Sequence, residues 1–339
     1  MNEETVTIEP AARAEETTHR RWYKVIQGAL AFVSIIFVVW SLAKDKDILL
    51  QAKEIAPHQI FLIIAILIVY FVLHAQRFVL LIEQHCRCRI PLLDWMRMLV
   101  VVRFMNNLVP QMGSVHRGIA LKRDFGVSYT DYIAANLFFI WTDTLLNFLI
   151  AFALFYLGSS PLELFGFPAG ALLGLAALGI LLAPFIGQLL LKSHHQPSKL
   201  VRKLAEVADE LTRGLREPRY MAATTVIAVL SFLLMTHVFR ILLGAIGAEV
   251  DLATLAVFYA LYRLTFHINV TPGNIGIREI AYGLLCAQAH IGMSKGLLIS
   301  AELRVLSIIV LITIGISVAG RELVAAWRTS REKRSLPHG

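Results

Sequence analysis

Long apolar runs dominate the hydrophobic pattern of this 339-residue chain. Several of them reach the roughly 20 residues that an α-helix needs to cross the hydrocarbon core of a bilayer. The pattern therefore predicts an all-α polytopic membrane protein with about six transmembrane helices. The predicted spans cover about residues 24–43, 59–82, 131–156, 168–191, 221–246 and 296–320.

Two further apolar segments, 91–110 and 252–270, carry polar side chains and lead into a proline followed by glycine. Proline ends a helix because it lacks an N–H donor and its ring clashes with the preceding turn. Glycine then lets the backbone turn back tightly. We therefore predict that each segment breaks, at residues 107–114 and 269–277 respectively.

Charges in the loops predict the topology. Lysine and arginine are concentrated at 192–220 and in the C-terminal tail, whereas the loops at 158–167 and 247–252 contain neither. Because basic loops stay in the cytoplasm, both termini are predicted to be cytoplasmic. The connector at 44–57 faces outside in this topology although it carries three lysines. We keep the topology because the charges of the other loops favour it.

The same count of lysine and arginine in the loops predicts that each broken segment returns to the membrane face from which it entered. Basic stretches flank the first on the cytoplasmic side, and the second opens to the outside, so the two re-entrant hairpins are oppositely oriented. We divide the chain into a polar cytoplasmic tail, a first membrane half, a basic cytoplasmic loop, a second membrane half and a basic cytoplasmic tail. These cover residues 1–23, 24–191, 192–220, 221–320 and 321–339.

A weak internal repeat supports this arrangement. An Asn-x-x-Pro element recurs 162 residues later, each copy is followed by glycine and arginine, and the next span carries an acid. With opposite hairpins, this indicates an inverted repeat whose discontinuous helices meet near the midplane. The matching residues are Asn107, Pro110, Gly113, Arg117 and Asp143 in the first half, and Asn269, Pro272, Gly276, Arg278 and Glu302 in the second.

Helices that restart within a membrane can bind anions. We expect each returning half-helix to point its free N–H groups and positive dipole end into the cavity. Arg117 and Arg278 lie close to those ends. An anionic headgroup that contains phosphate suits this arrangement.

Composition narrows the class of protein. Hydrophobic residues make up 57% of the chain and charged residues 17%, which excludes an ordinary soluble protein. The net charge of +8 lies in loops beside apolar runs, where anionic lipid and not nucleic acid is the partner. The three cysteines, Cys86, Cys88 and Cys286, form neither a disulfide framework nor a metal-ligand pattern, so we predict no metal and no cofactor.

Two elements of the chain resemble the membrane domain of the lysylphosphatidylglycerol synthase/flippase family. They are Asn106-Asn107-x-x-Pro110-x-x-Gly113-Ser114-x-x-Arg117 and Pro272-Gly273-x-x-Gly276-Ile277-x-Glu279. The order of segments is also similar from about residue 20 onward. His116 stands where the family commonly has an acidic residue, which leaves the substrate open.

The resemblance implies transfer of a lipid between leaflets, so we expect a transporter and not an enzyme. Aminoacylated phosphatidylglycerol is the substrate of the best-known members, and others act beside glycolipid or isoprenoid-lipid pathways. We expect a multi-pass protein of the cytoplasmic (inner) membrane. A lipid-modifying synthase or a glycosyltransferase is a possible partner, and a homo-oligomer is possible. Because the chain stops soon after the last span, we expect that it does not itself aminoacylate a lipid.

Polar residues within apolar segments are the remaining candidates. An intramembrane charge costs about 2.5–3.5 kcal/mol on insertion scales, so we interpret Arg103 and Arg263 as functional, with capping of open carbonyls as the alternative. The predicted substrate-binding residues are Arg103, Asn107, Pro110, Gly113, Ser114, Arg117, Asp143, Arg263, His267, Asn269, Pro272, Gly273, Gly276, Arg278, Glu279, Glu302 and Arg304.

For the acids we favour structural roles. Asp143 and Glu302 are each expected to form a buried ion pair with an arginine rather than to couple protons. For Glu279, capping of the half-helix start and substrate binding stand about even. His74 and Arg77, near the inner end of the second span, are expected to snorkel to the interface.

Two other functions stay open. A glycosyltransferase that uses a lipid-linked sugar would explain Asp45-x-Asp47 in the first external loop as metal-binding acids. A transporter of small solutes or ions would use the same inverted-repeat logic.

Overall fold

The computed structural model describes residues 55–86, 88–158, 160–192, 218–267 and 271–335, together with positions 36, 40 and 43. Several expectations fall outside the described residues. These are the polar tail, the first predicted span apart from three positions, Asp45 and Asp47, residues 193–217 of the basic loop, and Asn269.

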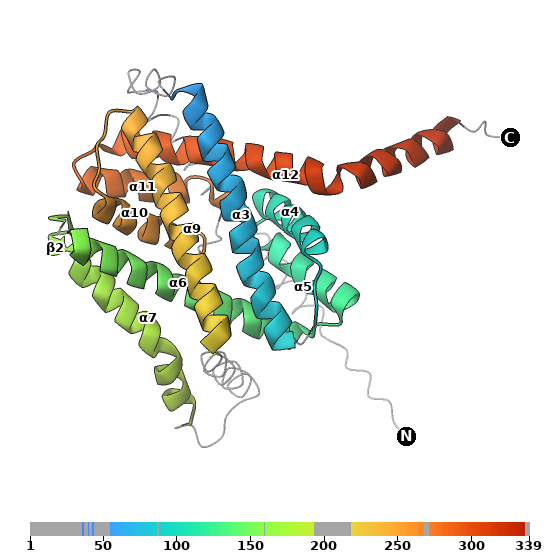
Figure 1. The fold of residues 1–339 in the computed structure, drawn as a ribbon, viewed down its shortest axis with the longest axis horizontal. Coiled ribbons are helices and arrows are strands. Elements are labelled where there is room, and N and C mark those ends of the chain that lie inside the picture. Colours follow the sequence, from blue (N-terminus) through green and yellow to red (C-terminus); the bar gives the residue numbers. More distant parts are fainter. Residues whose placement is uncertain are drawn as a thin grey trace, which may run out of the picture.

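Helices make up almost all of the described chain, with one short β-hairpin (Figure 1). The protein is therefore all-α, as the hydrophobic pattern predicts. The elements are α3 (Pro57–Cys86), α4 (Leu92–Leu108), α5 (Met112–Phe125), α6 (Tyr129–Gly158), β1 (Glu163–Leu164), β2 (Phe167–Pro168), α7 (Ala169–Lys192), α9 (Pro218–Ala245), α10 (Leu252–Leu264), η2 (Pro272–Asn274), α11 (Ile277–Gln288) and α12 (Met293–Ser335).

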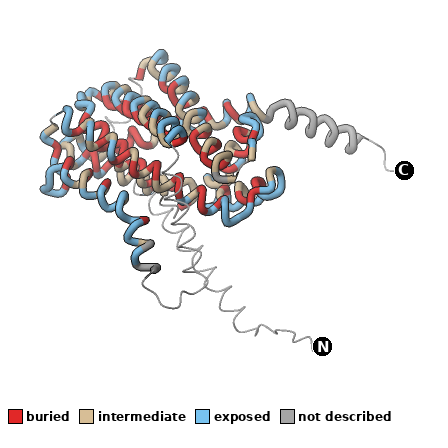
Figure 2. Tube along the Cα trace, turned by 60° about the horizontal axis from the view of Figure 1, so that its bottom comes forward, coloured by how far each residue is buried: buried red, intermediate tan, exposed pale blue. Residues whose placement is uncertain are grey.

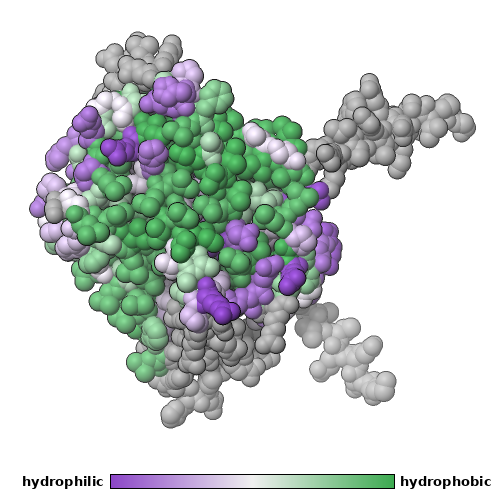
Figure 3. All heavy atoms as spheres, in the orientation of Figure 1, coloured by the Kyte–Doolittle hydropathy of each residue, from purple (hydrophilic) through white to green (hydrophobic). Residues whose placement is uncertain are grey.

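Five helices, α3, α6, α7, α9 and α12, are long and apolar enough to cross a membrane. They coincide with five of the predicted spans. Many of their large apolar side chains are exposed, among them Phe61 (74%), Leu157 (82%) and Leu175 (67%). Figure 2 shows much of α7 exposed, and Figure 3 shows apolar residues over most of one face. Such a surface suits lipid and not water, so this is a polytopic membrane protein.

Four helices are too short to cross. The longest of them, α4, has 17 residues and is therefore about 26 Å long, against about 30 Å for the hydrocarbon core. α4 and α5 lie side by side at one end of the bundle, and α10 and α11 lie at the other (Figure 1). α10 is buried on nearly all sides, between α6, α9 and α11.

The first break lies between α4 and α5. Val109 is extended, as the residue before a proline prefers, and it ends α4. Gln111 adopts a left-handed conformation (φ 63°) from which α5 starts in the opposite sense. A side chain at Gly113 would lie 2.1 Å from the carbonyl oxygen of Val102, so glycine alone lets α5 return this closely along α4.

The second break is longer. α10 ends at Leu264, before the end of its apolar run, and α11 begins only at Ile277. Between them lies η2, and Gly273 (φ 58°) and Gly276 (φ 84°) have left-handed backbones that favour glycine. The Asn274 amide donates to the carbonyl of Thr265 at 2.9 Å and ties the turn to the end of α10.

α11 packs on α12 with backbone against backbone. A Cβ built on Gly296 would lie 2.6 Å from the Tyr282 carbonyl oxygen and 2.8 Å from Gly283 Cα. The position therefore has no room for a side chain.

We expect Gly296→Ala to destabilise the protein by about 1–3 kcal/mol, because the added methyl group forces α11 and α12 apart. Thermal unfolding of the purified protein in detergent, followed by tryptophan fluorescence, measures this. Gly179→Ala on α7 is the matched control, because no atom lies within 4 Å of its added Cβ. An unfolding temperature for Gly296→Ala as high as that of the control would contradict the packing.

Candidate functional site

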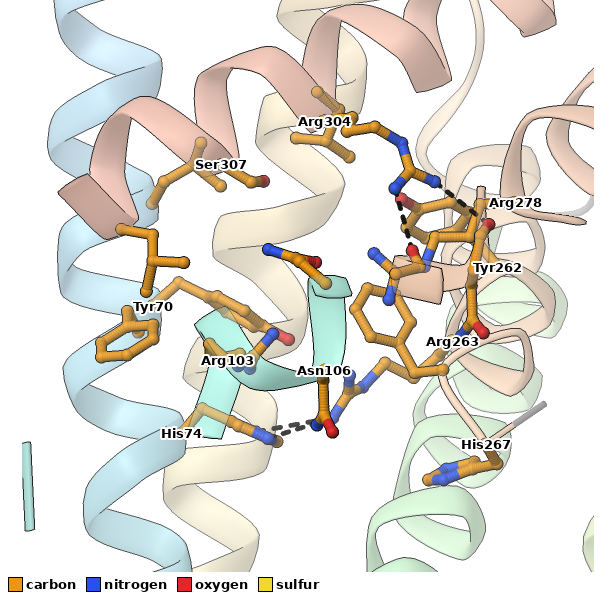
Figure 4. Close-up of a pocket in the computed structure, with 18 of the residues that line it drawn as sticks. Tyr70, His74, Arg103, Asn106, Tyr262, Arg263, His267, Arg278, Arg304 and Ser307 are labelled. Carbon is orange, nitrogen blue, oxygen red and sulfur yellow. Dashed lines mark hydrogen bonds between the residues drawn. The ribbon is translucent and has the colours of Figure 1, made fainter. Parts of the chain in front are cut away.

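A cavity of about 480 Å³ lies in the middle of the bundle and has the size of a small-ligand site. Its walls come from α3, α4, α5, α6, α9, α10, η2, α11 and α12, so both membrane halves contribute. Figure 4 shows side chains of these elements around the shared space. The cavity is the candidate functional site of the described chain.

Five arginines line the cavity, and no carboxylate is among its described lining residues. Arg103 and Arg117 come from the first half, and Arg263, Arg278 and Arg304 come from the second. A membrane-embedded space with this charge attracts an anion, because a buried charge is costly without a partner.

Asp143 lies behind the wall and not in it. One of its carboxylate oxygens accepts a hydrogen bond from Arg77, and the other accepts from Arg263 at 2.9 Å. All three side chains are at most 6% exposed. The expected buried ion pair is confirmed, and it joins α3, α6 and α10. The Arg263 guanidinium also lies 3.4 Å from the His74 ring (Figure 4).

Arg304 closes the second break. Its guanidinium donates to the carbonyl oxygens of Gly273 at 2.9 Å and Asn274 at 3.1 Å (Figure 4). It also donates to Glu279 Oε1 at 2.6 Å. The other Glu279 oxygen accepts from the Gly276 N–H at 2.7 Å, which confirms the capping role of Glu279. Capping of these carbonyls falls to Arg304, and not to Arg103 or Arg263 as the alternative reading has it.

At the first break, side chains and carbonyls of the protein already accept from the start of α5. The Gly113 N–H donates to Asn106 Oδ1 at 2.8 Å, and the Ser114 and Val115 N–H groups donate to the Gln111 carbonyl. With Glu279 on the Gly276 N–H, each half-helix start has at least one N–H satisfied by a side chain of the protein. The expectation that the free N–H groups at these starts form an anion site stays a prediction, and five arginine side chains add positive charge to the cavity.

The two breaks meet beside the cavity. A Cβ on Gly273 would lie 2.9 Å from Asn107 Oδ1, so η2 touches the end of α4. The segments are 162 residues apart in the repeat, and their contact places both breaks at one site.

The predicted site residues divide into two groups. Those that line the cavity are Arg103, Asn107, Ser114, Arg117, Arg263, His267, Gly273, Arg278 and Arg304. Those described outside its lining are Pro110, Gly113, Asp143, Pro272, Gly276, Glu279 and Glu302, most of which shape or brace the breaks. Both Glu302 carboxylate oxygens are buried without a hydrogen-bond partner among the described residues, so its expected ion pair is wrong.

Sequence reasoning missed two polar residues of α3. His74 lines the cavity, and Arg77 is 2% exposed and bound to Asp143, so the expectation that they snorkel to the interface is wrong. A signal for them existed. The two residues are three apart on one face of an apolar span, and an intramembrane charge is functional by default.

Comparison with known proteins gives the family. The family model described as "Lysylphosphatidylglycerol synthase TM region" matches residues 25–315, which is most of the chain. The chain therefore belongs to this family, as the two proline-glycine elements indicate. No curated protein and no solved structure shows significant similarity to the chain.

We expect Asp143→Asn to destabilise the protein by about 3–5 kcal/mol, because Arg77 and Arg263 then keep buried charges without a counter-ion. Thermal unfolding in detergent measures the loss. Asp124→Asn, which removes an exposed carboxylate beside Arg123, is the control and is expected to unfold like the original chain. Equal unfolding temperatures for both variants would show that the triad does not hold the bundle together.

Proposed function

We propose that this protein is a lipid translocase, a flippase or scramblase, and not an enzyme. Its cargo would be an anionic or zwitterionic phospholipid, an aminoacyl-lipid or a glycolipid that moves between leaflets. Membership of a family named for a membrane domain of lipid metabolism supports a lipid-related role. The observation that carries the proposal is the amphipathic wall of the arginine-lined cavity.

Apolar side chains line the cavity together with the arginines. Leu67 of α3 and Ile308 and Leu311 of α12 are among them, and we call these three residues the apolar strip. Ile308 is 43% exposed, so this apolar strip continues to the outer surface of the bundle. A soluble anion makes no use of such a strip, whereas an acyl chain gains by contact with it. The cavity thus favours a lipid over a small solute.

The helix order supports alternating access. In each half a short helix, a break, a second short helix and a long apolar helix follow one another, as α4–α5–α6 and as α10–α11–α12. We propose that both short pairs are re-entrant hairpins that open to opposite faces and form an inverted repeat. The headgroup would bind where the breaks meet, and rocking of the hairpins would expose it to either side.

The loop charges extend the proposal to location. The protein would lie in the cytoplasmic membrane with both termini in the cytoplasm. A synthase or glycosyltransferase that makes or uses the lipid would be its functional partner.

Reconstitution tests the function directly. Full-length protein in liposomes is expected to speed the exchange of a fluorescent lipid between leaflets, measured by loss of fluorescence on adding a membrane-impermeant reductant. Phosphatidylglycerol, lysyl-phosphatidylglycerol, phosphatidic acid and phosphatidylethanolamine carry the label in turn. Exchange no faster than in protein-free liposomes for all four lipids would overturn the proposal.

A bulky side chain at the apolar strip is expected to block this exchange. Ser307 is exposed on α12 and lines the cavity, so Ser307→Trp fills the space between the strip and the arginines. We expect exchange to fall to the protein-free rate while the unfolding temperature stays unchanged. Ser317→Trp, at an exposed position of the same helix outside the cavity lining, is expected to keep full exchange. Similar rates for both variants would place the lipid route elsewhere.

A further inference from the structure

Three of the five cavity arginines have no carboxylate partner within the described chain. Arg263 pairs with Asp143 and Arg304 with Glu279, whereas Arg103, Arg117 and Arg278 form no ion pair there. Asp143 is moreover shared with Arg77, so one carboxylate faces two guanidinium groups. Within the described chain, no further carboxylate balances the charge of this site.

The same three arginines keep donors free. A guanidinium has five N–H donors. Arg117 uses Nε on the Tyr132 hydroxyl at 3.0 Å and Nη2 on Asn136 Oδ1 at 2.7 Å, and its Nη1 donates to no described residue. Arg103 and Arg278 donate no hydrogen bond to a described residue, and Arg278 Nε is buried without a partner. A buried donor without an acceptor is costly, so these groups point to an oxygen-rich ligand.

Aromatic rings hold the three guanidiniums. Phe71 lies 5.7 Å from Arg103, Phe78 lies 4.3 Å from Arg117, and Phe266 lies 3.8 Å from Arg278, measured from Cζ to the ring centroid. A ring that contacts the face of a guanidinium leaves the edge, where all N–H groups lie, available, and the short distances at Arg117 and Arg278 suit such a contact. Edges held in this way match the oxygens of a phosphate.

The charge count separates classes of headgroup. A lysyl headgroup brings ammonium groups, which find no carboxylate in the described lining and instead face five arginines. A phosphodiester brings one negative charge, fewer than the three unpaired arginines. A terminal phosphate carries about −1.5 to −2 at neutral pH and a diphosphate carries more.

We propose that the cavity selects a lipid whose headgroup ends in a phosphate or diphosphate and rejects aminoacylated headgroups. The proposal rests on the proposed translocase function and names the substrate class of the same site. It differs from what the family name suggests, because that name refers to a lysylated lipid.

Two lipids that differ by one methyl group test whether the charge of the headgroup determines binding. Phosphatidic acid ends in a phosphomonoester. Phosphatidylmethanol with the same acyl chains is its methyl ester and is therefore a phosphodiester. We expect the full-length protein in detergent to bind phosphatidic acid at least about tenfold more tightly, and lysyl-phosphatidylglycerol more weakly than either. Equal affinities, or tightest binding of the lysylated lipid, would overturn the proposal.

Inorganic phosphate and pyrophosphate distinguish a lipid site from a soluble-anion site. If the apolar strip takes part in binding, neither ion displaces phosphatidic acid at matched concentration. Displacement by either ion at the concentration of the lipid would overturn the lipid assignment.

Single variants test which arginines cause the preference for phosphatidic acid. Arg103→Gln and Arg278→Gln are each expected to weaken phosphatidic acid binding about tenfold and phosphatidylmethanol binding less, because each removes an unpaired charge. Since neither arginine has a carboxylate partner, their unfolding temperatures are not expected to fall. Arg240→Gln, on an exposed part of α9 outside the cavity lining, is expected to bind both lipids like the original chain. Loss of both lipids to the same extent in the two cavity variants would contradict charge selection.

The outcomes separate the two proposals. Leaflet exchange of phosphatidylglycerol without preferential binding of phosphatidic acid would refute the headgroup assignment alone. Preferential binding of phosphatidic acid without exchange of any lipid would refute the translocase function, and the cavity would remain a site for a terminal phosphate.

Discussion

A helix that breaks inside a bilayer must satisfy its own open backbone groups, and the centre of this protein is organised around that constraint. Each unpaired N–H or C=O group in hydrocarbon costs several kcal/mol. At the second break Arg304 supplies three donors, two of them to carbonyls, and Glu279 accepts from the N–H of Gly276, the residue just before α11. At the first break Asn106 performs the equivalent task for Gly113. The side chains that close the breaks also form or adjoin the cavity.

This internal closure determines what is left for a ligand. Glu279 and Asn106 each accept from one N–H at a helix start, and arginine side chains line the cavity beside them. Asp143 and Glu279 neutralise only part of the positive charge, and three arginines that lie within about 6 Å of phenylalanine rings keep donors available. The site thus separates structural arginines, which hold the fold, from arginines whose partner is absent from the described protein.

The sequence predicts this fold where the signal is local. Apolar length predicts α3, α6, α7, α9 and α12, and proline with glycine predicts where the backbone turns between α4 and α5. Partners far apart in the chain are not predicted, because no local pattern encodes them. Arg77 meets Asp143 across 66 positions, and nothing in the apolar run of α3 distinguishes an arginine that snorkels from one that is buried. For the same reason the sequence does not show that Glu302 lacks an arginine partner among the described residues, because such a partner would come from a distant part of the chain.

The hydrogen bonds that fasten the two breaks also affect how the two halves can move relative to each other. The first hairpin is fastened to the long helix that follows it, because Arg117 of α5 bonds Tyr132 and Asn136 of α6. The second is fastened in the same way, because Arg304 of α12 holds η2 and Glu279. Among the described residues, no hydrogen bond or ion pair joins α4 and α5 to η2 and α11, although Gly273 touches Asn107. The two halves are linked elsewhere, because Arg263 of α10 bonds Asp143 of α6 at 2.9 Å and Arg97 of α4 donates to the Val318 carbonyl of α12 at 3.2 Å. Rocking of the halves about a shared site would have to keep or break these links. A ligand that bridges arginines of both halves would add a link where the two breaks touch.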